Sequence, residues 1–327
     1  MGRMNFIRCI APLLFAGLSA MAFAQTPDVP VYNEGNNAEP TAAIRDQCRT
    51  LKKNGQLLDF KKTDEQMNRK TCELKLASAG TTKLDSRDLW KRARKGHIRV
   101  GWFDKTEDEK ELKVGLSGGY ALTEDTVVTC GHVVSHEDDV TEGYLIAVDD
   151  DDKVYPITEI LAVNLATDCA ILKIKGGKFA PLPLSVDVVP GDKVVCFSDP
   201  LDRRGFYAEG IVNRFVKRPF LHDEEAEKAA GKHGKISDEM PVWMCVTNDW
   251  AQGSSGSAVI DAFGNAVGHV SEIEPVMEDP LDPKDDSEAA KKEAEQAPRG
   301  TVIVFHEAIT AKNVLTLVKP KPEAAQW

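Results

Sequence analysis

Short runs of β-branched and aromatic residues, separated by Gly, Asp and Pro, recur along most of this chain and restrict its fold more than any other feature. Pro190-Gly191 divides these runs into two series of six. Many short strands joined by turn residues are typical of β-sandwiches and β-barrels. The sequence therefore predicts an all-β domain built from two similar sheets. The expected strands are 97–103, 119–122, 127–130, 144–148, 154–163 and 169–174, then 193–197, 206–216, 242–246, 258–260, 266–270 and 301–305.

Composition limits the classes of partner. The 327 residues are 42% hydrophobic and 28% charged, which is enough apolar content for a core. Lysine and arginine number 41 against 52 acidic residues, and a net charge of −11 argues against the basic face that a nucleic-acid binder needs. The only long uncharged apolar run lies at the N-terminus, so no later membrane span is expected. We expect a soluble mature protein that does not bind nucleic acid.

That N-terminal run has the form of a secretory signal. Arg3 and Arg8 lead into an apolar stretch, 9–23, and residues 22–24 (Ala-Phe-Ala) offer the small side chains of a cleavage site. An uncleaved anchor helix is the alternative, but about 15 apolar residues are short for a bilayer. We expect residues 1–24 to be removed as a signal peptide and the protein to be periplasmic or extracellular.

Residues 25–90 are expected to hold a flexible arm and a helical hairpin. The arm, 26–40, is rich in Pro, Asn and Glu, whereas 42–53 and 63–79 have helix-forming composition and are separated by the turn Asn54-Gly55. A packing appendage is the simpler role for the hairpin. Partner binding or homo-oligomerisation is the alternative.

Two polar insertions, 221–240 and 274–299, interrupt the second series of strands. The second insertion holds nine acidic and four basic residues, so it carries a net charge of −5. Stretches this polar bury little area, and both are expected to be exposed loops or short helices. The second insertion could gate a cleft or attract basic substrates, but a solvated loop is the simpler expectation. A helix over 308–318 and a tail, 321–327, are expected to follow.

Six cysteines remain after the signal is removed, and an even number in an oxidising compartment permits disulfides with 15 complete pairings. Cys48 and Cys72 share one polar, helix-prone segment and are the most plausible pair. The other four lie in apolar strand-like runs, where a free buried thiol is common. No C-x-x-C spacing occurs, so a zinc site is not predicted, and no cofactor is expected.

Three separated residues suggest nucleophilic chemistry. Ser255 lies between glycines ahead of an apolar run, where a tight loop can expose a hydroxyl and aim backbone N–H groups at one point. His132 ends the run 127–130, where it could act as a base, and Asp168 precedes 169–174, where it could orient that base. Each residue alone has an ordinary structural explanation, as turn, strand end or strand start.

Together, the segments around these residues resemble trypsin-like serine proteases of the bacterial HtrA type. The resemblance covers about residues 95–318, with 36 residues from His132 to Asp168 and 87 from Asp168 to Ser255. The matching blocks are Gly115–Val134, Asn164–Ile174, Gly191–Val212 and Gly253–Gly268.

The resemblance implies a chymotrypsin-like double six-stranded β-barrel over 91–320, with barrels at about 95–185 and 186–318. It also implies a serine endopeptidase that acts on polypeptides through an acyl-enzyme. Ser255 would attack the peptide carbonyl, His132 would transfer the proton and Asp168 would orient the imidazole. The backbone N–H groups of Gly253 and Ser255 would form the oxyanion hole.

The sequence departs from the family pattern at several positions, and these departures limit which family properties can be expected here. Ser254 stands where digestive trypsins have an aspartate, which argues against their activation by an N-terminal ammonium. The sequence shows no PDZ domain, so a stand-alone protease domain is expected. Ser257 matches glutamyl endopeptidases, but their specificity histidine would fall one position after His269. Asp249, six residues before Ser255, and its neighbour Trp250 are candidates for the specificity pocket.

Two alternatives remain. His132 and His136 are four residues apart and could ligate zinc on a helix, but the glutamate of H-E-x-x-H is missing and no third ligand is indicated. A catalytically silent protease fold that serves as a binding or chaperone module is the second alternative. Ser254, Ser257 and the long insertions favour it, whereas the complete set of three candidate catalytic residues argues against it.

Overall fold

The computed structural model describes residues 30, 32, 42–136, 138–218, 240–278 and 299–320. The chain divides into two units, 1–33 and 34–327, and every described helix and strand belongs to the second unit. The expected signal peptide, the tail and nearly all of the arm lie outside the described residues. No helix in the described ranges is both long and apolar enough to cross a membrane.

The first sheet is an open half-barrel with the strand order β4-β3-β7-β8-β9-β6-β5, and a short strand, β1, adds to β7. A bridge between His97 and Tyr120 links the start of β3 to β5 at the other end of this order. Its core is built from apolar side chains on alternating positions, such as Val100, Ile157 and Leu172. The strands are β1 (Leu58–Asp59), β3 (Arg99–Thr106), β4 (Lys113–Ser117), β5 (Tyr120–Thr123), β6 (Thr126–Thr129), β7 (Val140–Val148), β8 (Val154–Asn164) and β9 (Cys169–Ile174).

The second sheet is a closed barrel of six antiparallel strands in the order β10-β11-β12-β15-β14-β13. A separate apolar cluster that includes Val194, Met244 and Val259 fills it. The strands are β10 (Lys193–Ser198), β11 (Phe206–Lys217), β12 (Val242–Val246), β13 (Ala258–Asp261), β14 (Ala266–Met277) and β15 (Thr301–Thr310). The half-barrel and the closed barrel confirm the expected chymotrypsin-like double barrel.

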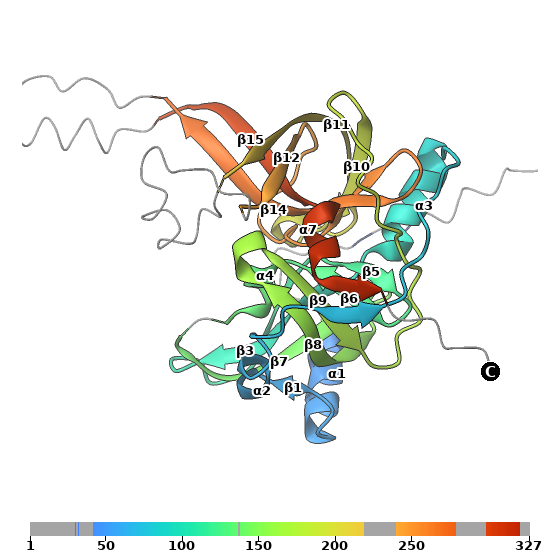
Figure 1. Ribbon diagram of the computed structural model, residues 1–327. Helices are drawn as coiled ribbons and strands as arrows, with labels where there is room; N and C mark the ends of the chain where they lie inside the picture. Colours follow the sequence, from blue (N-terminus) through green and yellow to red (C-terminus); the bar gives the residue numbers. More distant parts are fainter. Residues whose placement is uncertain are drawn as a thin grey trace, which may run out of the picture. The chain divides into compact units, whose positions relative to one another are not determined.

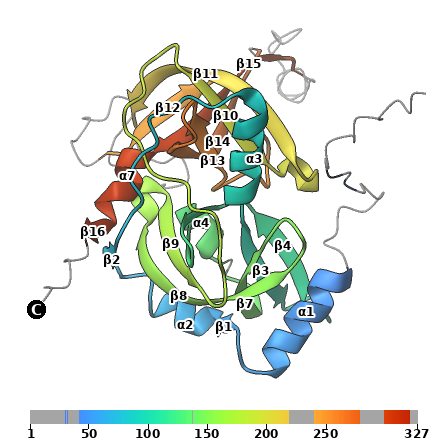
Figure 2. The same ribbon diagram turned by 90° about the vertical axis from the view of Figure 1, so that its right-hand side faces the viewer.

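The two sheets pack on each other through a shared apolar cluster (Figures 1 and 2). Tyr120 and Val128 come from the first sheet, and Phe197 and Trp243 come from the closed barrel. Two helices, α3 (Ser86–Gly96) and α7 (Ala311–Thr316), add Leu89 and other apolar residues to the same cluster. A continuous core therefore fixes how the ends of β6 and β9 meet the loops of the closed barrel.

The expected helical hairpin is only half correct. The first helix, α1 (Ala42–Lys53), forms as predicted, but 63–79 is not a helix. That segment holds only the end of α2 (Phe60–Asp64) and a short strand, β2 (Cys72–Leu74), which pairs in parallel with β16 (Val318–Pro320).

Contacts with β8 explain why the second helix does not form. The backbone N–H of Ile160 donates to the Gln66 side chain, and that of Val163 donates to the Arg69 carbonyl. These bonds to the main body of the protein outweigh a helix propensity that is worth only fractions of a kcal/mol per residue.

Strand ends also differ from the expectation around the second insertion. β14 continues to Met277, so the insertion begins as a strand, and the rest of it, 279–298, lies outside the described residues. The first insertion is likewise undescribed from 219 to 239. β15 runs to Thr310, which leaves the expected helix over 308–318 as the shorter α7.

The expected disulfide between Cys48 and Cys72 does not form, and all six described cysteines are free thiols. Cys48 lies on the buried face of α1 in a cluster with Phe103, whereas Cys72 packs against the cluster shared by the two sheets. The unexpected strand β2 carries Cys72 to β16, and this separates the two cysteines into different cores. Burial raises the pKa of Cys48 to about 12 and that of Cys72 to about 11.

Candidate active site

His132 lies in a one-turn helix, α4 (Gly131–Val134), directly after β6. Because β6 pairs with β9, Thr129 lies opposite Ala170, and the end of β6 meets the residue that precedes β9. That residue is Asp168. Nδ1 of His132 lies 3.0 Å from Oδ1 and 3.1 Å from Oδ2 of Asp168, and the His132 backbone N–H donates to Oδ1 at 3.0 Å. One carboxylate therefore holds both the ring and the backbone of His132.

Asp168 is fixed by the closed barrel as well as by the first sheet. Its carboxylate accepts a hydrogen bond from the hydroxyl of Ser271, and its backbone carbonyl accepts one from Nε2 of His269 at 2.9 Å. The residue has a left-handed backbone with φ of 46°, which ends the 3-10 turn Leu165–Thr167 and directs the chain into β9. Asp168 is fully buried, whereas the side chain of His132 is 39% exposed.

The charges of this pair stabilise each other. Burial alone would raise the pKa of the Asp168 carboxyl, but hydrogen bonds from His132 and Ser271 and the charge of His132 hold that pKa well below its usual range. Burial alone would lower the pKa of His132, yet the hydrogen bond and charge of Asp168 raise it, and Glu272 adds to the rise. The imidazole is thus a stronger base than an ordinary histidine.

The loop that carries Ser255 packs against the end of β6. The backbone N–H of Gly256 donates to the Val270 carbonyl at 2.8 Å, and the thiol of Cys130 donates to the same oxygen at 3.1 Å. Gly256 has φ of 87°, and a Cβ there would lie only 2.4 Å from the hydroxyl of Thr129. Glycine is therefore required by both conformation and space. The half-buried Ser255 precedes this glycine, and His132 follows Cys130 by two residues.

Two backbone donors flank the candidate nucleophile. Within the described ranges, neither the N–H of Gly253 nor that of Ser255 donates to a backbone carbonyl, whereas the N–H of Ser254 donates to Ala251 at 3.0 Å. Gly253 has φ of 93°, a conformation that other residues rarely adopt. These two N–H groups are the ones expected to form an oxyanion hole. Ser254 is buried, and its hydroxyl donates to that of Ser198.

A network of charged residues that includes Asp199 packs against the loop that carries Gly253. The carbonyl of Asp199 would lie 2.9 Å from a Cβ at Gly253, and the N–H of Leu201 donates to Gln252 at 2.7 Å. The Asp199 carboxylate contacts Nε2 of His97 at 3.3 Å and accepts from the Gly205 N–H at 2.7 Å.

The same network crosses between the two sheets. Nε of Arg99 approaches Asp199 at 4.0 Å, while its Nη2 pairs with Asp152 at 2.6 Å. Arg204 joins Asp152 at 3.0 Å from the loop that follows β10. Burial alone would raise the pKa of Asp199, but His97, Gly205 and Arg99 together hold it below its usual value. The loop behind Gly253 is therefore tied to the first sheet by ion pairs.

The candidate specificity residues occupy different environments. Asp249 is 79% exposed and pairs with His306 at 3.3 Å. Trp250 is buried in the closed barrel, and its indole N–H donates to the Glu272 carbonyl at 3.2 Å. Their role in specificity stays a prediction.

A second acidic group, which no sequence motif predicts, lies beside the His132–Asp168 pair. Glu272 follows Ser271 directly, and both Glu272 and Glu307 are buried around the guanidinium of Arg218. The hydroxyl of Ser271 on Asp168 and the buried His269 were missed as well. None of these residues has a spacing or motif that marks it, because the contacts depend on how the two barrels pack.

Three potential metal ligands lie close together at this site. The ligand atoms of Cys130, His132 and Asp168 lie within 4.8 Å of one another. Burial raises the pKa of the Cys130 thiol far above its usual value, so the thiolate that a metal requires is strongly disfavoured there. The two histidines of the alternative zinc site contact different carboxylates. His136 contacts Asp64 at 3.0 Å, and His132 contacts Asp168.

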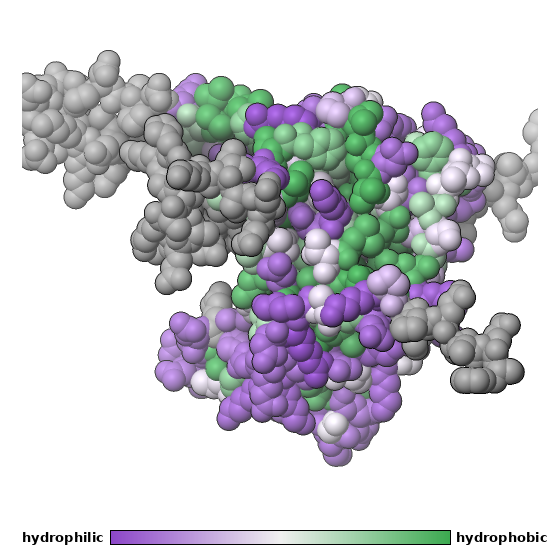
Figure 3. Space-filling model, viewed as in Figure 1, coloured by the Kyte–Doolittle hydropathy of each residue, from purple (hydrophilic) through white to green (hydrophobic). Residues whose placement is uncertain are grey.

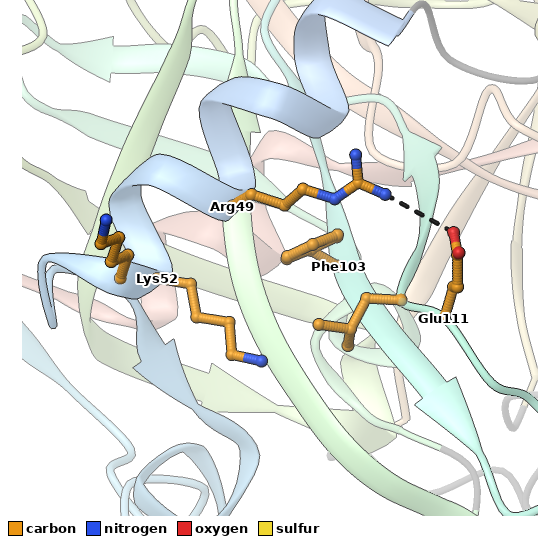
Figure 4. A pocket seen from close by; sticks show the side chains of 6 residues that line it. Arg49, Lys52, Phe103 and Glu111 are labelled. Atoms are coloured by element: carbon orange, nitrogen blue, oxygen red, sulfur yellow. Dashed lines mark ion pairs between the residues drawn. The ribbon is translucent and has the colours of Figure 1, made fainter.

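A hollow of about 500 Å³ lies elsewhere, between α1 and the β3–β4 region. Figure 4 shows Arg49 and Lys52 beside Phe103, with Arg49 reaching toward Glu111 at 3.5 Å. None of the candidate catalytic residues lines this hollow.

A family model and several solved structures are similar to parts of this chain. Residues 117–268 match the family model described as a trypsin-like peptidase domain. A search among curated proteins found no match.

Three similar solved structures illustrate the range of matches. The first is an inactive form of Rv3671c from Mycobacterium tuberculosis, with 16% identity, 75% of this chain and 94% of that chain covered, and a TM-score of 0.46. The second is the HtrA-type protease AlgW with a tripeptide, with 17% identity, 71% and 62% covered, and a TM-score of 0.48. The third is a serine endoprotease from Yersinia pestis, with 16% identity, 72% and 65% covered, and a TM-score of 0.44. The matched region thus spans less than two thirds of the second and third chains.

Proposed function

Taking residues 117–268 as a trypsin-like peptidase domain, we propose that this chain is an exported serine endopeptidase that hydrolyses polypeptides. The observation that carries the proposal is the buried Asp168 carboxylate, which holds both Nδ1 and the backbone N–H of His132. A carboxylate in this position fixes the ring so that Nε2 can accept a proton. The half-exposed imidazole is then a base available to the proposed nucleophile, Ser255.

In the proposed reaction, the hydroxyl oxygen of Ser255 attacks the peptide carbonyl while Nε2 of His132 takes the hydroxyl proton. The backbone N–H groups of Gly253 and Ser255 donate to the oxyanion that develops. His132 then gives its proton to the leaving amine, and an acyl-enzyme forms on Ser255. Water activated by the same imidazole releases the acid and restores the serine. Asp168 stabilises the imidazolium in both steps and stays ionised.

A serine-directed organophosphonate probe tests the nucleophile on the full chain. We expect wild-type protein to be labelled and Ser255→Ala to be unlabelled. Ser257→Ala is the matched control, because its hydroxyl is buried and has no hydrogen-bond partner among the described residues. This control should still be labelled. Equal labelling of wild type and Ser255→Ala would contradict the assignment of the nucleophile.

Cleavage of unfolded casein tests the base. We expect wild type to cleave and His132→Ala to lose cleavage, because the serine proton then has no acceptor. His136→Ala is the control on the same short segment, since this histidine contacts Asp64 rather than Asp168. Wild-type protein that neither takes the probe nor cleaves casein would favour the silent binding module instead.

Export is part of the proposal and rests on the N-terminal sequence alone. N-terminal sequencing of the protein recovered outside the cytoplasm should begin at Gln25. A product that begins at Met1 or that stays in the cytoplasm would contradict export without bearing on the chemistry of Ser255.

A further inference from the structure

Two buried cysteines lie next to the candidate catalytic pair. Cys130 precedes His132 by two residues, and Cys169 directly follows Asp168. Both cysteine side chains are 0% exposed and take no part in the proposed reaction. Figure 3 shows mostly polar surface over the first sheet, which agrees with apolar side chains, these two cysteines included, that point inward. Two free thiols at one site, in a chain that is expected to be exported, are candidates for oxidation.

The register of β6 and β9 places the two cysteines opposite each other. Thr129 lies opposite Ala170, and one further step along both strands brings Cys130 opposite Cys169. The chain still runs beside β9 at this step, because a Cβ on Gly131 would lie 3.4 Å from the backbone nitrogen of Cys169. No other two cysteines in the described ranges occupy opposite positions on paired strands.

The hydrogen-bond pattern shows how close these two positions are. The N–H of Ile174 donates to the carbonyl of Asp125, so these opposite residues form a hydrogen-bonded pair. Hydrogen-bonded and non-hydrogen-bonded pairs alternate along antiparallel strands. Cys130 and Cys169 therefore form a non-hydrogen-bonded pair, in which the Cα atoms are about 4.5 Å apart. A disulfide requires Cα atoms about 4.4–6.8 Å apart, so this pair meets the requirement.

The two sulfur atoms also approach neighbouring residues of the closed barrel. The thiol of Cys130 donates to the carbonyl of Val270 at 3.1 Å, and Sγ of Cys169 lies 4.0 Å from Nε2 of His269. His269 and Val270 are consecutive on β14. The thiol of Cys169 donates to the Thr167 carbonyl at 3.1 Å. A thiol is a weak donor, so rotation of the two side chains would exchange two weak hydrogen bonds for one covalent bond.

We propose that Cys130 and Cys169 are an oxidation site, and that the exported protein carries a disulfide between them that joins the ends of β6 and β9. The structure holds the reduced form of this pair. The inference rests on the export that is part of the proposed function. It adds to that function a covalent link between the strands that carry His132 and Asp168.

The oxidant is a disulfide of the kind present in oxidising compartments, either small or carried by a protein. The thiolate of one cysteine attacks a sulfur of this disulfide, forms a mixed disulfide and expels a thiolate. The thiolate of the other cysteine then attacks the cysteine sulfur of the mixed disulfide and expels the second thiolate. Two cysteine thiols are oxidised, the oxidant is reduced to two thiols, and these thiols take up the two cysteine protons.

The bond forms while the chain folds. β6 and β9 belong to the first sheet, whereas β14, which covers both sulfurs, belongs to the closed barrel. A first sheet that forms before the two sheets pack therefore presents both thiols to the oxidant. After packing, burial raises the pKa of both thiols far above the usual value, which leaves little thiolate for exchange.

The bond closes a loop that contains both His132 and Asp168. The loop holds 38 residues between the two cysteines. Restricting the unfolded chain over a loop of this length raises the unfolding temperature by about 10 °C. The contact between His132 and Asp168 lies at the same strand ends, so the bond keeps the two residues together as the protein is warmed.

Mass spectrometry of full-length protein recovered outside the cytoplasm tests the bond. Free thiols are blocked with N-ethylmaleimide in denaturant before digestion, and we expect two peptides linked through Cys130 and Cys169. Blocked thiols at both positions, or a bond from either cysteine to a different one, overturn the proposal. Reduced full-length protein refolded with oxidised glutathione should form the same bond, so the result does not depend on whether the chain is exported.

Thermal unfolding measures what the bond contributes. Wild type that is reduced with dithiothreitol in urea and then refolded should unfold about 10 °C below the oxidised protein. The double variant Cys130→Ala with Cys169→Ala should not respond to this treatment, because it has no bond to lose. Cys196→Ala is the matched control, because it removes a buried thiol of the closed barrel and should respond as wild type does. A response of the double variant as large as that of wild type overturns the proposal.

Cleavage of a short chromogenic peptide relates the bond to the active site. Oxidised and reduced wild type should have kcat values within about twofold at 25 °C, and only the oxidised form should cleave between the two unfolding temperatures. Equal heat resistance of the two forms overturns the proposal. Failure of the protease function is distinguishable, because neither form would then cleave at any temperature while the linked peptides would still be found.

Discussion

The two sheets contribute different kinds of group to the candidate active site. The first sheet supplies charged side chains: His132 follows β6, Asp168 precedes β9, and the carboxylate of Asp168 contacts the ring of His132. The closed barrel supplies backbone: Gly253 and Gly256 both have positive φ and hold the Ser255 loop in a conformation that few other residues adopt. Electrostatic interactions therefore hold the part of the site that comes from the first sheet, which we call the charged half. Backbone geometry holds the part that comes from the closed barrel, which we call the backbone half.

Substitutions in the two halves should therefore impair the site in different ways. A change in the charged half should alter protonation and leave the shape of the site intact, whereas a change in the backbone half should alter shape and leave protonation intact. Ser271 is the exception, because it reaches from β14 to the Asp168 carboxylate and couples the halves. The following variants separate the two kinds of effect.

The largest effect is expected for Asp168→Asn. The amide presents an N–H where the carboxylate accepted from His132, which favours the wrong tautomer of the ring. We expect kcat on a short chromogenic peptide to fall about 10⁴-fold at neutral pH with little change in KM. Steady-state kinetics and thermal unfolding of the same preparation test this. A loss below about tenfold in a folded protein would show that Asp168 does not orient the base.

Gly253→Ala tests the backbone half and should have the next largest effect. Its φ of 93° disfavours alanine, and the added Cβ would lie 2.9 Å from the Asp199 carbonyl. Loss of one oxyanion donor costs about 10²- to 10³-fold in kcat. We expect the acid limb of the pH profile to stay in place, in contrast to variants of the charged half.

Gly176→Ala is the matched control for this backbone effect. Its φ is 78°, so it carries the same kind of strain, but no atom lies within 4 Å of the added Cβ. It should lower the unfolding temperature slightly and leave kcat unchanged. Similar kcat losses in both variants would attribute the effect to general strain rather than to the oxyanion loop.

Elements with a strong local pattern were predictable from the sequence. β9 and β12 begin and end where the apolar runs indicated, because side-chain alternation and flanking turn residues define a strand locally. His132 and Asp168 could be paired only through their motifs, since neither residue alone excludes a structural role. The ring contact then follows from the β6–β9 register.

Elements that depend on distant pairing were not predictable. β2 forms only because β16, more than 240 residues later, lies beside it, and its own sequence favours a helix. Asp199, Ser271 and Glu272 become part of the site through the packing of two barrels. The spacing that singled out Asp249 carries no information about burial, and the structure places that carboxylate largely in solvent.

Asp199→Asn tests the charged network that packs against the Gly253 loop. The Asn side chain can still accept from the Gly205 N–H, but the charge that faces His97 and Arg99 is lost. We expect a loss of about 2 kcal/mol in unfolding free energy and a kcat loss of about tenfold or less. Chemical denaturation at several pH values measures the first quantity.

The pH dependence of this loss has a defined sign. The folded-state pKa of Asp199 is lowered, so its stabilisation is present above the ordinary Asp pKa and disappears as the pH falls through the folded value. The difference in stability between wild type and Asp199→Asn should therefore be full at neutral pH and shrink only in strong acid. A difference that is already lost near pH 6 would assign the effect to a histidine instead.

The smallest effect tests how far the charged half extends into the closed barrel. Glu272, on β14, raises the pKa of His132, and His132 must be neutral to act as a base. Glu272→Gln should therefore lower that pKa and move the acid limb of kcat/KM on a short peptide to lower pH. Glu274→Gln, two residues along the same strand and exposed, should leave the limb where it is. An equal displacement in both variants would mean that the net charge of β14, rather than the buried Glu272, sets the basicity of His132.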